Sequence, residues 1–139
     1  MNKLLFHELH QKARLSIKEV NEALKEYELY SAQWSILYSL KKLGAMTQTE
    51  IWQYLNVEAP TVTRTLVKLE QRKLITRNEG KDKRERIVQL TEEAQSLIPK
   101  IEKRIDEVEQ QLLISLSADD LNQLTKLLKQ IGSGGGSNV

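Results

Sequence analysis

The segment GKDKRERIVQLT at residues 80–91 sets a dense group of charges before an alternating run of β-branched residues. Three of its basic side chains are suited to attract phosphates or to enter a narrow minor groove of DNA. They are Lys81, Lys83 and Arg84. Asp82 stands two residues before Arg84, where its carboxylate can hold the guanidinium in one rotamer. The alternative interpretation is a solvated hairpin tip with an incidental ion pair of little energetic value.

Basic residues gather around this segment instead of being spread along the chain. From Arg64 to Arg86 there are nine basic and four acidic residues, which gives this stretch a net charge of +5. The whole chain of 139 residues carries only +2, so the remainder has a net charge of −3. A localised basic segment on a nearly neutral protein is typical of a DNA-binding surface.

The helix predicted just upstream offers side chains that suit a major groove. Its inward stripe is Val62, Leu66 and Leu69, which turns a polar set outward, comprising Thr61, Thr63, Arg64 and Lys68. A threonine can donate, accept or contact a thymine methyl, and an arginine can read guanine or clamp a phosphate. Arg86, at the base of the following hairpin, faces either backbone phosphate or the protein itself. A plain polar helix face is the alternative, but the adjoining basic hairpin favours DNA.

Other chemistries have little support. Cysteine is absent, which excludes disulfides, thiol catalysis and thiol redox sensing. His7 and His10 share one helix face, so metal binding is geometrically open, yet no third ligand stands out. There is no glycine-rich phosphate loop, and no serine, histidine and carboxylate grouping stands out as catalytic. The sequence therefore predicts neither an enzyme nor a bound metal or cofactor.

The spacing of apolar residues predicts the elements that position these side chains. Residues 4–27 carry one helical stripe, and a second helix is expected from a cap at Ser31 to Gly44. The stretch AM after it favours a strand of two or three residues, and TQTEIWQYLN favours a helix of about two turns. Thr47 and Glu50 have the spacing of a capping box for that short helix.

A helix-turn-helix and a hairpin follow directly. Pro60 suits the first turn of a helix that extends to Gln71, because its φ angle is preset and it has no N–H to leave unpaired. The apolar period then changes to two, which predicts strands at residues 74–77 and 86–90 joined by NEGKDKRE. Two short helices followed by a two-stranded hairpin make a winged helix-turn-helix.

Two further helices and a tail complete the chain. Thr91 is expected to cap a helix of more than about 20 residues that contains Pro99. Ser117 and Asp120 have capping-box spacing for a final helix, and GSGGGSNV is expected to be a flexible tail. We therefore predict a mainly α fold with a small β wing. Its regions are a helical dimerisation region at 1–30 and 92–131, a DNA-binding region at 31–91 and a tail at 132–139.

Three stretches occur in the order typical of one known family. They are LYSAQWSILYSL, then NVEAPTVTRTLVKLEQRKLI, then the wing, DKR followed by RIVQLT. With them the chain resembles the MarR-type winged-helix transcription regulators over roughly residues 3–131. Tyr30 and Ala94 depart from residues common in that family, but neither departure affects the DNA site.

The resemblance implies an obligate homodimer that binds a pseudo-palindromic operator. Each recognition helix would enter a major groove, with the two helices about one DNA turn, ~34 Å, apart. Carried over by position, Arg84 is the minor-groove arginine and Asp82 its orienting carboxylate. The apolar stripes at both ends of the chain fit a two-fold interface, although packing within one chain is the alternative.

The resemblance also implies a small anionic or aromatic effector, for which Trp34 and Tyr38 are candidate contacts beside their plainer interpretation as core. We expect a repressor relieved by such an effector. A winged-helix adaptor that binds protein and never reads DNA remains the alternative. No apolar run is long enough for a membrane span, and the N-terminus turns polar too soon for a secretory signal, so a cytoplasmic location is expected.

Overall fold

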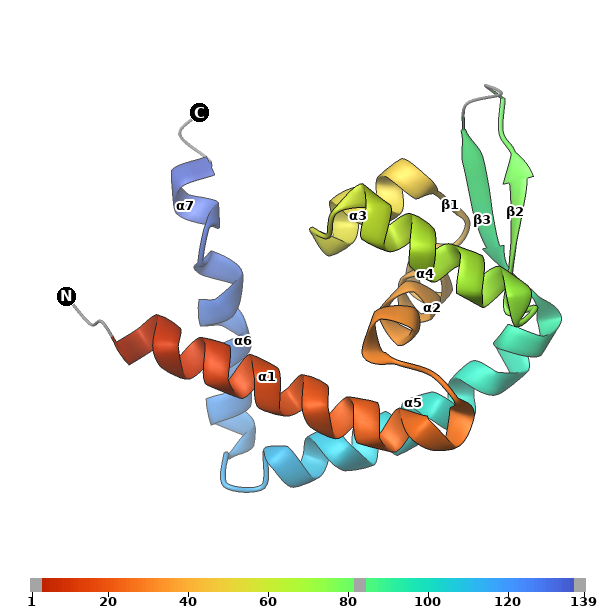
Figure 1. Cartoon of the computed structure of the whole chain (residues 1–139). Helices are drawn as coiled ribbons and strands as arrows, with labels where there is room; N and C mark the ends of the chain where they lie inside the picture. Colours follow the sequence, from red (N-terminus) through yellow and green to blue (C-terminus); the bar gives the residue numbers. More distant parts are fainter. Residues whose placement is uncertain (1–3, 82–84, 137–139) are drawn as a thin grey trace. The chain divides into compact units, whose positions relative to one another are not determined.

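The computed structural model of the chain describes residues 4–81 and 85–136 (Figure 1). Residues up to Val108 form one compact unit, and residues from Glu109 form a second. Helices dominate both units, and the first unit also contains a small antiparallel sheet. This confirms the predicted mainly α class with a β wing. Asp82, Lys83 and Arg84 lie outside the described residues.

The first helix is shorter than its apolar period predicts. Helix α1 spans Leu4–Leu24 and gives way to a 3₁₀ turn, η1, at Lys25–Tyr27. The chain reverses at Glu28, which adopts a left-handed conformation with φ 56°. The main-chain N–H of Leu29 then bonds to the carbonyl of Leu24 at 3.2 Å. This turn, which no glycine marks in the sequence, is why the α-helix ends early.

Helix α2 spans Ser31–Leu43 and ends at Gly44, as predicted, but its cap differs from the expectation. Ser31 is already helical, and its N–H donates to Oδ1 of Asn21 at 2.6 Å. The capping position falls to Tyr30, whose N–H donates to Oε1 of Gln33 at 2.9 Å. The prediction of Ser31 as cap is therefore wrong, because an asparagine from α1 satisfies the helix start instead.

The sheet has three strands, in the order β1-β3-β2. Strands β2 (Ile75–Glu79) and β3 (Arg86–Leu90) form an antiparallel hairpin, which projects beyond α3 and α4 in Figure 1. Strand β3 has its predicted bounds, whereas β2 begins one residue later than predicted and extends two residues further, because Asn78 and Glu79 pair with β3. Strand β1 (Met46–Thr47) adds to the other edge of β3, with Met46 opposite Val88. The middle of β3 is thus paired with the segment that leads into the helix-turn-helix.

The helix-turn-helix consists of α3 (Gln48–Leu55) and α4 (Ala59–Gln71). The capping box is confirmed. Thr47 Oγ1 accepts from the N–H of Glu50 at 3.1 Å, and the carboxylate Oε1 of Glu50 accepts from the N–H of Thr47 at 2.9 Å. Asn56 closes α3 in a left-handed conformation. Helix α4 begins one residue before the predicted Pro60.

The core of the first unit fixes the orientation of α4. Its predicted inward stripe, Val62, Leu66 and Leu69, is buried. These side chains belong to one cluster with residues from α2, α3, α5 and the sheet, including Leu40, Ile51, Val88 and Ile101. Burying one apolar face in this way determines which side chains of α4 face solvent.

The C-terminal helices begin at the predicted caps. Helix α5 spans Glu92–Leu112 and continues through Pro99, and Thr91 Oγ1 accepts from the N–H of Ala94 at 3.2 Å. In the second unit, α6 spans Ala118–Gln130 with a capping box made by Ser117 and Asp120. The tail contains one short helical turn, α7, at Ser133–Gly136.

Candidate nucleic-acid interface

The outer face of α4 carries the polar side chains that the sequence predicts there. Thr63, Arg64 and Lys68 are exposed, and Thr61 is half-buried. Arg64 Nη2 lies 3.3 Å from Thr61 Oγ1, so the threonine restrains the guanidinium. Thr63 Oγ1 donates to the carbonyl of Ala59 at 3.1 Å, which leaves its oxygen lone pairs and its methyl group for contact. The placement of these side chains is confirmed, whereas their contacts with DNA stay predictions.

The described part of the wing carries charge on both sides of its tip. Lys81 and Arg86 are exposed, and so is Glu85. The N–H of Gly80 donates to the carbonyl of Glu85 at 3.0 Å, which closes the hairpin. Arg86 opens β3 opposite Glu79. The Arg86 side chain therefore faces solvent and is not buried in the protein. Its contact with backbone phosphate stays a prediction.

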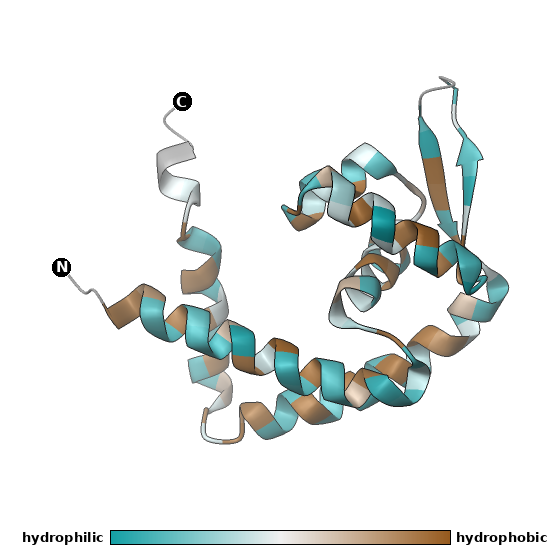
Figure 2. Cartoon of the chain, in the orientation of Figure 1, coloured by the Kyte–Doolittle hydropathy of each residue, from teal (hydrophilic) through white to brown (hydrophobic). Residues whose placement is uncertain are grey.

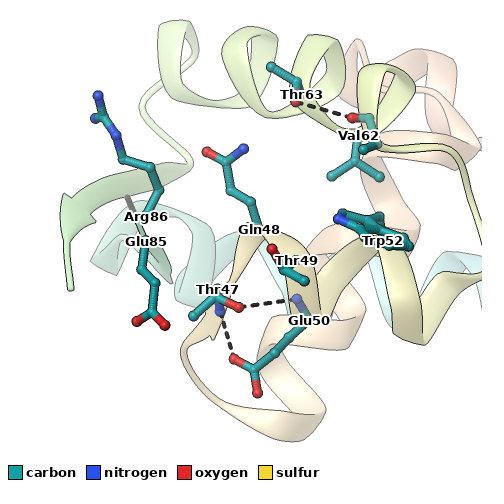
Figure 3. Close-up of a pocket in the computed structure, with 10 residues that line it drawn as sticks. Thr47, Gln48, Thr49, Glu50, Trp52, Val62, Thr63, Glu85 and Arg86 are labelled. Carbon is teal, nitrogen blue, oxygen red and sulfur yellow. Dashed lines mark hydrogen bonds between the residues drawn. The ribbon is translucent and has the colours of Figure 1, made fainter. Parts of the chain in front are cut away.

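A groove of about 550 Å³ separates the wing from the helix-turn-helix. Figure 3 shows its walls, which come from the start of α3, the start of α4 and the start of β3. Its lining joins predicted residues to others that sequence reasoning missed: Thr47, Gln48, Thr49, Glu50, Trp52, Ala59, Val62, Thr63, Glu85 and Arg86. Thr47 and Glu50 carry the capping-box motif, but no sequence motif marks them or the other missed residues as groove residues, because three separate segments of the chain form the groove.

Arg77 holds the walls of this region together. Its Nη2 and Nε lie 2.9 Å and 3.3 Å from Glu70 Oε1 of α4, and its Nη1 lies 3.2 Å from Gln48 Oε1 of α3. The side chain is only 17% exposed. Arg77 adds to the basic count of the sequence, but Glu70 neutralises it, so it is a link between β2, α3 and α4 instead of a free charge for DNA.

The aromatic pair of α2 divides between core and surface. Trp34 is buried and belongs to the core cluster, while Tyr38 is exposed, with ring centroids 5.8 Å apart. The core interpretation therefore holds for Trp34. Among residues 4–81 and 85–136, no three His, Cys, Asp or Glu side chains gather as a metal site, so His7 and His10 lack a third ligand there.

The sequence is similar to known transcriptional regulators over most of its length. The model of the MarR family matches residues 29–85. The chain is 45% identical over 129 residues to the uncharacterized HTH-type transcriptional regulator YwoH of Bacillus subtilis, covering 93% of this chain and 94% of that protein. The chain belongs to the MarR family. It is a winged-helix transcriptional regulator and not an enzyme.

Solved structures of MarR proteins share the fold. A cysteine-to-serine mutant of MarR from E. coli, in complex with operator DNA, superposes with a TM-score of 0.85 at 24% identity, covering 95% of this chain and 99% of that one. BpsR from Bordetella bronchiseptica gives a TM-score of 0.86 at 19% identity, covering 93% and 98%. Within the described residues of this MarR protein, no helix is long and apolar enough to cross a membrane.

Proposed function

We propose that this MarR-family protein is a homodimeric repressor that binds a pseudo-palindromic operator and is released by a small effector. The observation that carries the proposal is the shared face of α4 and the wing, where Arg64, Lys68 and Arg86 are all exposed. Arg86 and Thr63 line one polar groove between the wing and the helix-turn-helix, while the opposite face of α4 is buried in the core. Such a face suits the phosphates and base edges of duplex DNA.

Each predicted site residue then has a role. Thr61, Thr63, Arg64 and Lys68 meet the major groove, where threonine and arginine can contact base edges and lysine a phosphate. From the sequence, Lys81 and Lys83 contact phosphates, Arg84 enters the minor groove and Asp82 orients it. Arg86, exposed at the tip end of β3, contacts backbone phosphate. Residues 31–91 thus form the DNA-binding region.

Exposed large apolar side chains support a homodimer. Figure 2 shows hydrophobic bands recurring along α1. Five large apolar residues of this helix are exposed in the single chain: Leu4, Leu5, Phe6, Leu15 and Ile17. In the second unit, α6 and the segments on either side of it expose a further set: Ile114, Leu116, Leu124, Leu127, Leu128 and Ile131. Exposed apolar surface on this scale is typical of an interface. We infer that residues 1–30 and 92–131 form a two-fold dimer.

A small effector is supported by one relative. The DNA binding of BpsR is regulated by 6-hydroxynicotinic acid. We infer that an anionic or aromatic molecule acts likewise here, in the cytoplasm, near the exposed ring of Tyr38. Titration with 6-hydroxynicotinic acid as probe would then weaken DNA binding, and Tyr38→Ala would reduce that response. Unchanged DNA affinity at saturating concentrations of aromatic acids would contradict the effector.

Selection of bound duplexes from a random pool tests the function most broadly. The proposal predicts a recovered sequence with two-fold symmetry and half-sites about one helical turn apart, roughly 10 base pairs. Sedimentation of the free protein should show a dimer. Failure to enrich any sequence, with feeble binding to every duplex, would contradict DNA recognition and favour an adaptor that binds protein. An asymmetric site bound by a monomer would contradict the dimer alone.

A further inference from the structure

We propose that Gln48 contacts a DNA phosphate through its amide N–H groups and that Arg77 fixes the carboxamide in the orientation this requires. The inference rests on the proposed DNA-binding function and adds two residues to it. Neither residue belongs to the recognition helix or to the wing tip, where the sequence directs attention. Gln48 lines the groove, and the largely buried guanidinium of Arg77 meets its carboxamide.

Gln48 occupies a fixed position at the groove. It is the first residue of α3, directly after the capping residue Thr47, whose two bonds with Glu50 hold the helix start in place. Figure 3 shows its side chain extending into the groove between Arg86 of β3 and the α4 wall that carries Thr63. The side chain is half-buried, so its reach is limited to this space.

The chemistry of arginine decides which end of the carboxamide faces outward. A guanidinium has only donors, so the group it bonds must present an acceptor. Gln48 therefore turns Oε1 toward Arg77 Nη1, at 3.2 Å, and turns its NH₂ away. Among the described residues, that NH₂ group has no hydrogen-bond partner in the protein. Two N–H donors are left for a ligand with acceptor oxygens.

Glu70 makes this orientation rigid. One carboxylate oxygen of Glu70 accepts from both Nε and Nη2 of Arg77, which leaves Nη1 directed at Gln48. The Arg77 side chain is 17% exposed, so the guanidinium is shielded from solvent on most sides, whereas the Glu70 side chain is 41% exposed. A side chain ordered before binding loses less conformational entropy when the complex forms. Glu70 and Arg77 are thus positioning residues, and Gln48 is the contact.

The position of α3 indicates the source of the acceptor. In a helix-turn-helix the first helix crosses the DNA backbone, while the second enters the major groove. Gln48 lies on the first helix, beside the exposed cation Arg86. A phosphate oxygen therefore fits better than a base edge. Both carry acceptors, and a comparison of duplexes distinguishes them.

The first test changes only the hydrogen-bonding character of Gln48. Gln48→Glu keeps the shape and keeps an oxygen for Arg77, but replaces both outward donors with an acceptor. We expect binding to the duplex selected by the wild-type chain to weaken roughly tenfold or more, with unchanged melting temperature and dimerisation. Gln53→Glu is the matched control, because Gln53 lies on the same helix but does not line the groove.

The outcomes separate the alternatives. Equal losses for Gln48→Glu and Gln53→Glu would mean general charge repulsion and would overturn the contact, as would an unchanged affinity of Gln48→Glu. Equal fold losses on the selected duplex and on an unrelated duplex of the same length support a phosphate. A loss confined to the selected duplex would overturn the phosphate assignment. If the wild-type chain binds no duplex, the proposed function itself fails.

A double-mutant cycle tests the positioning role of Arg77. Arg77→Met removes the donor that orients the amide, so Gln48→Met should reduce affinity less in that background than in the wild type. A merely structural Arg77 would lower the melting temperature and leave the two losses in affinity additive. Additive losses would therefore overturn the claim that Arg77 acts through Gln48, whatever the stability of the single variants.

Discussion

Arg72 Nη1 donates to the main-chain carbonyl of Glu28 at 2.5 Å, which joins the end of the recognition helix to the junction between α1 and α2. The two residues are 44 positions apart in the chain. Glu28 presents this carbonyl because it is in the left-handed conformation that ends η1. The contact links the helix proposed to read DNA with the helix proposed to form the dimer.

Removing this contact should loosen the recognition helix. We expect Arg72→Ala to lower the free energy of unfolding by about 2 kcal/mol, because a hydrogen bond from a charged donor is lost. Lys68→Ala is the matched control, because it removes an exposed basic side chain from the same helix. It should change the free energy of unfolding by only about 0.5 kcal/mol. Urea titration of both variants measures the difference. Equal effects would mean that the Arg72 contact contributes nothing specific.

Adjacent residues on α4 offer a matched test of its orientation. Leu66 is 0% exposed and Val67 is 37% exposed. We expect Leu66→Ala to lower the free energy of unfolding by roughly 2–5 kcal/mol, since it leaves a cavity in the core. Val67→Ala should cost about 0.5 kcal/mol. If thermal unfolding gave the reverse order, the helix would present a different face to the core.

The capping box of α6 predicts a lowered pKa for the Asp120 carboxyl. The main-chain N–H of Ser117, and secondarily its hydroxyl, hold the pKa of Asp120 below its ordinary value. Because the folded-state pKa is lowered, the ionised carboxylate stabilises the helix at neutral pH. That contribution is lost as pH falls through the ordinary carboxyl range to the lowered pKa.

Carboxyl carbon shifts followed by NMR report this directly. The pKa of Asp120 should be low in the wild type and should rise part of the way toward the ordinary value in Ser117→Ala, which keeps the N–H but loses the hydroxyl. An Asp120 that titrates normally in the wild type would contradict the cap.

The wing tip gives a prediction that rests on sequence alone, because residues 82–84 lie outside the described ranges. We expect Arg84→Ala to weaken operator binding roughly tenfold or more while dimer and fold stay intact. Asp82→Ala should cause a smaller loss, since the carboxylate orients the arginine and does not touch DNA. Gel-shift titration with sedimentation measures both. A loss for Asp82→Ala as large as that for Arg84→Ala would mean that Asp82 chiefly holds the wing's fold.

Local signals in the sequence predict much of the fold. The capping box of Thr47 and Glu50 depends only on residues three apart, and the structure contains both bonds. The buried stripe Val62, Leu66 and Leu69 follows from helical spacing. These features were predictable because the interactions that cause them lie within one or two turns of chain.

The features that sequence reasoning missed join distant segments. Asn21 replaces the expected cap of α2 from ten residues away. Gln48 and Arg77 are 29 residues apart, and the sequence shows the charge of Arg77 but not its pairing with Glu70. Spacing along the chain carries no information on such contacts. Single residues of each wall were therefore predicted, but the groove that the walls form together was not.

The salt dependence of DNA binding tests the central claim most directly. The affinity of the wild-type chain for its selected duplex should be measured by titration between about 50 and 200 mM salt. A dimer whose two basic faces contact six or more phosphates should lose roughly 1,000-fold in affinity over that range, because bound counterions are released from the duplex. Weak binding that stays nearly constant with salt would contradict a DNA-binding face built from α4 and the wing.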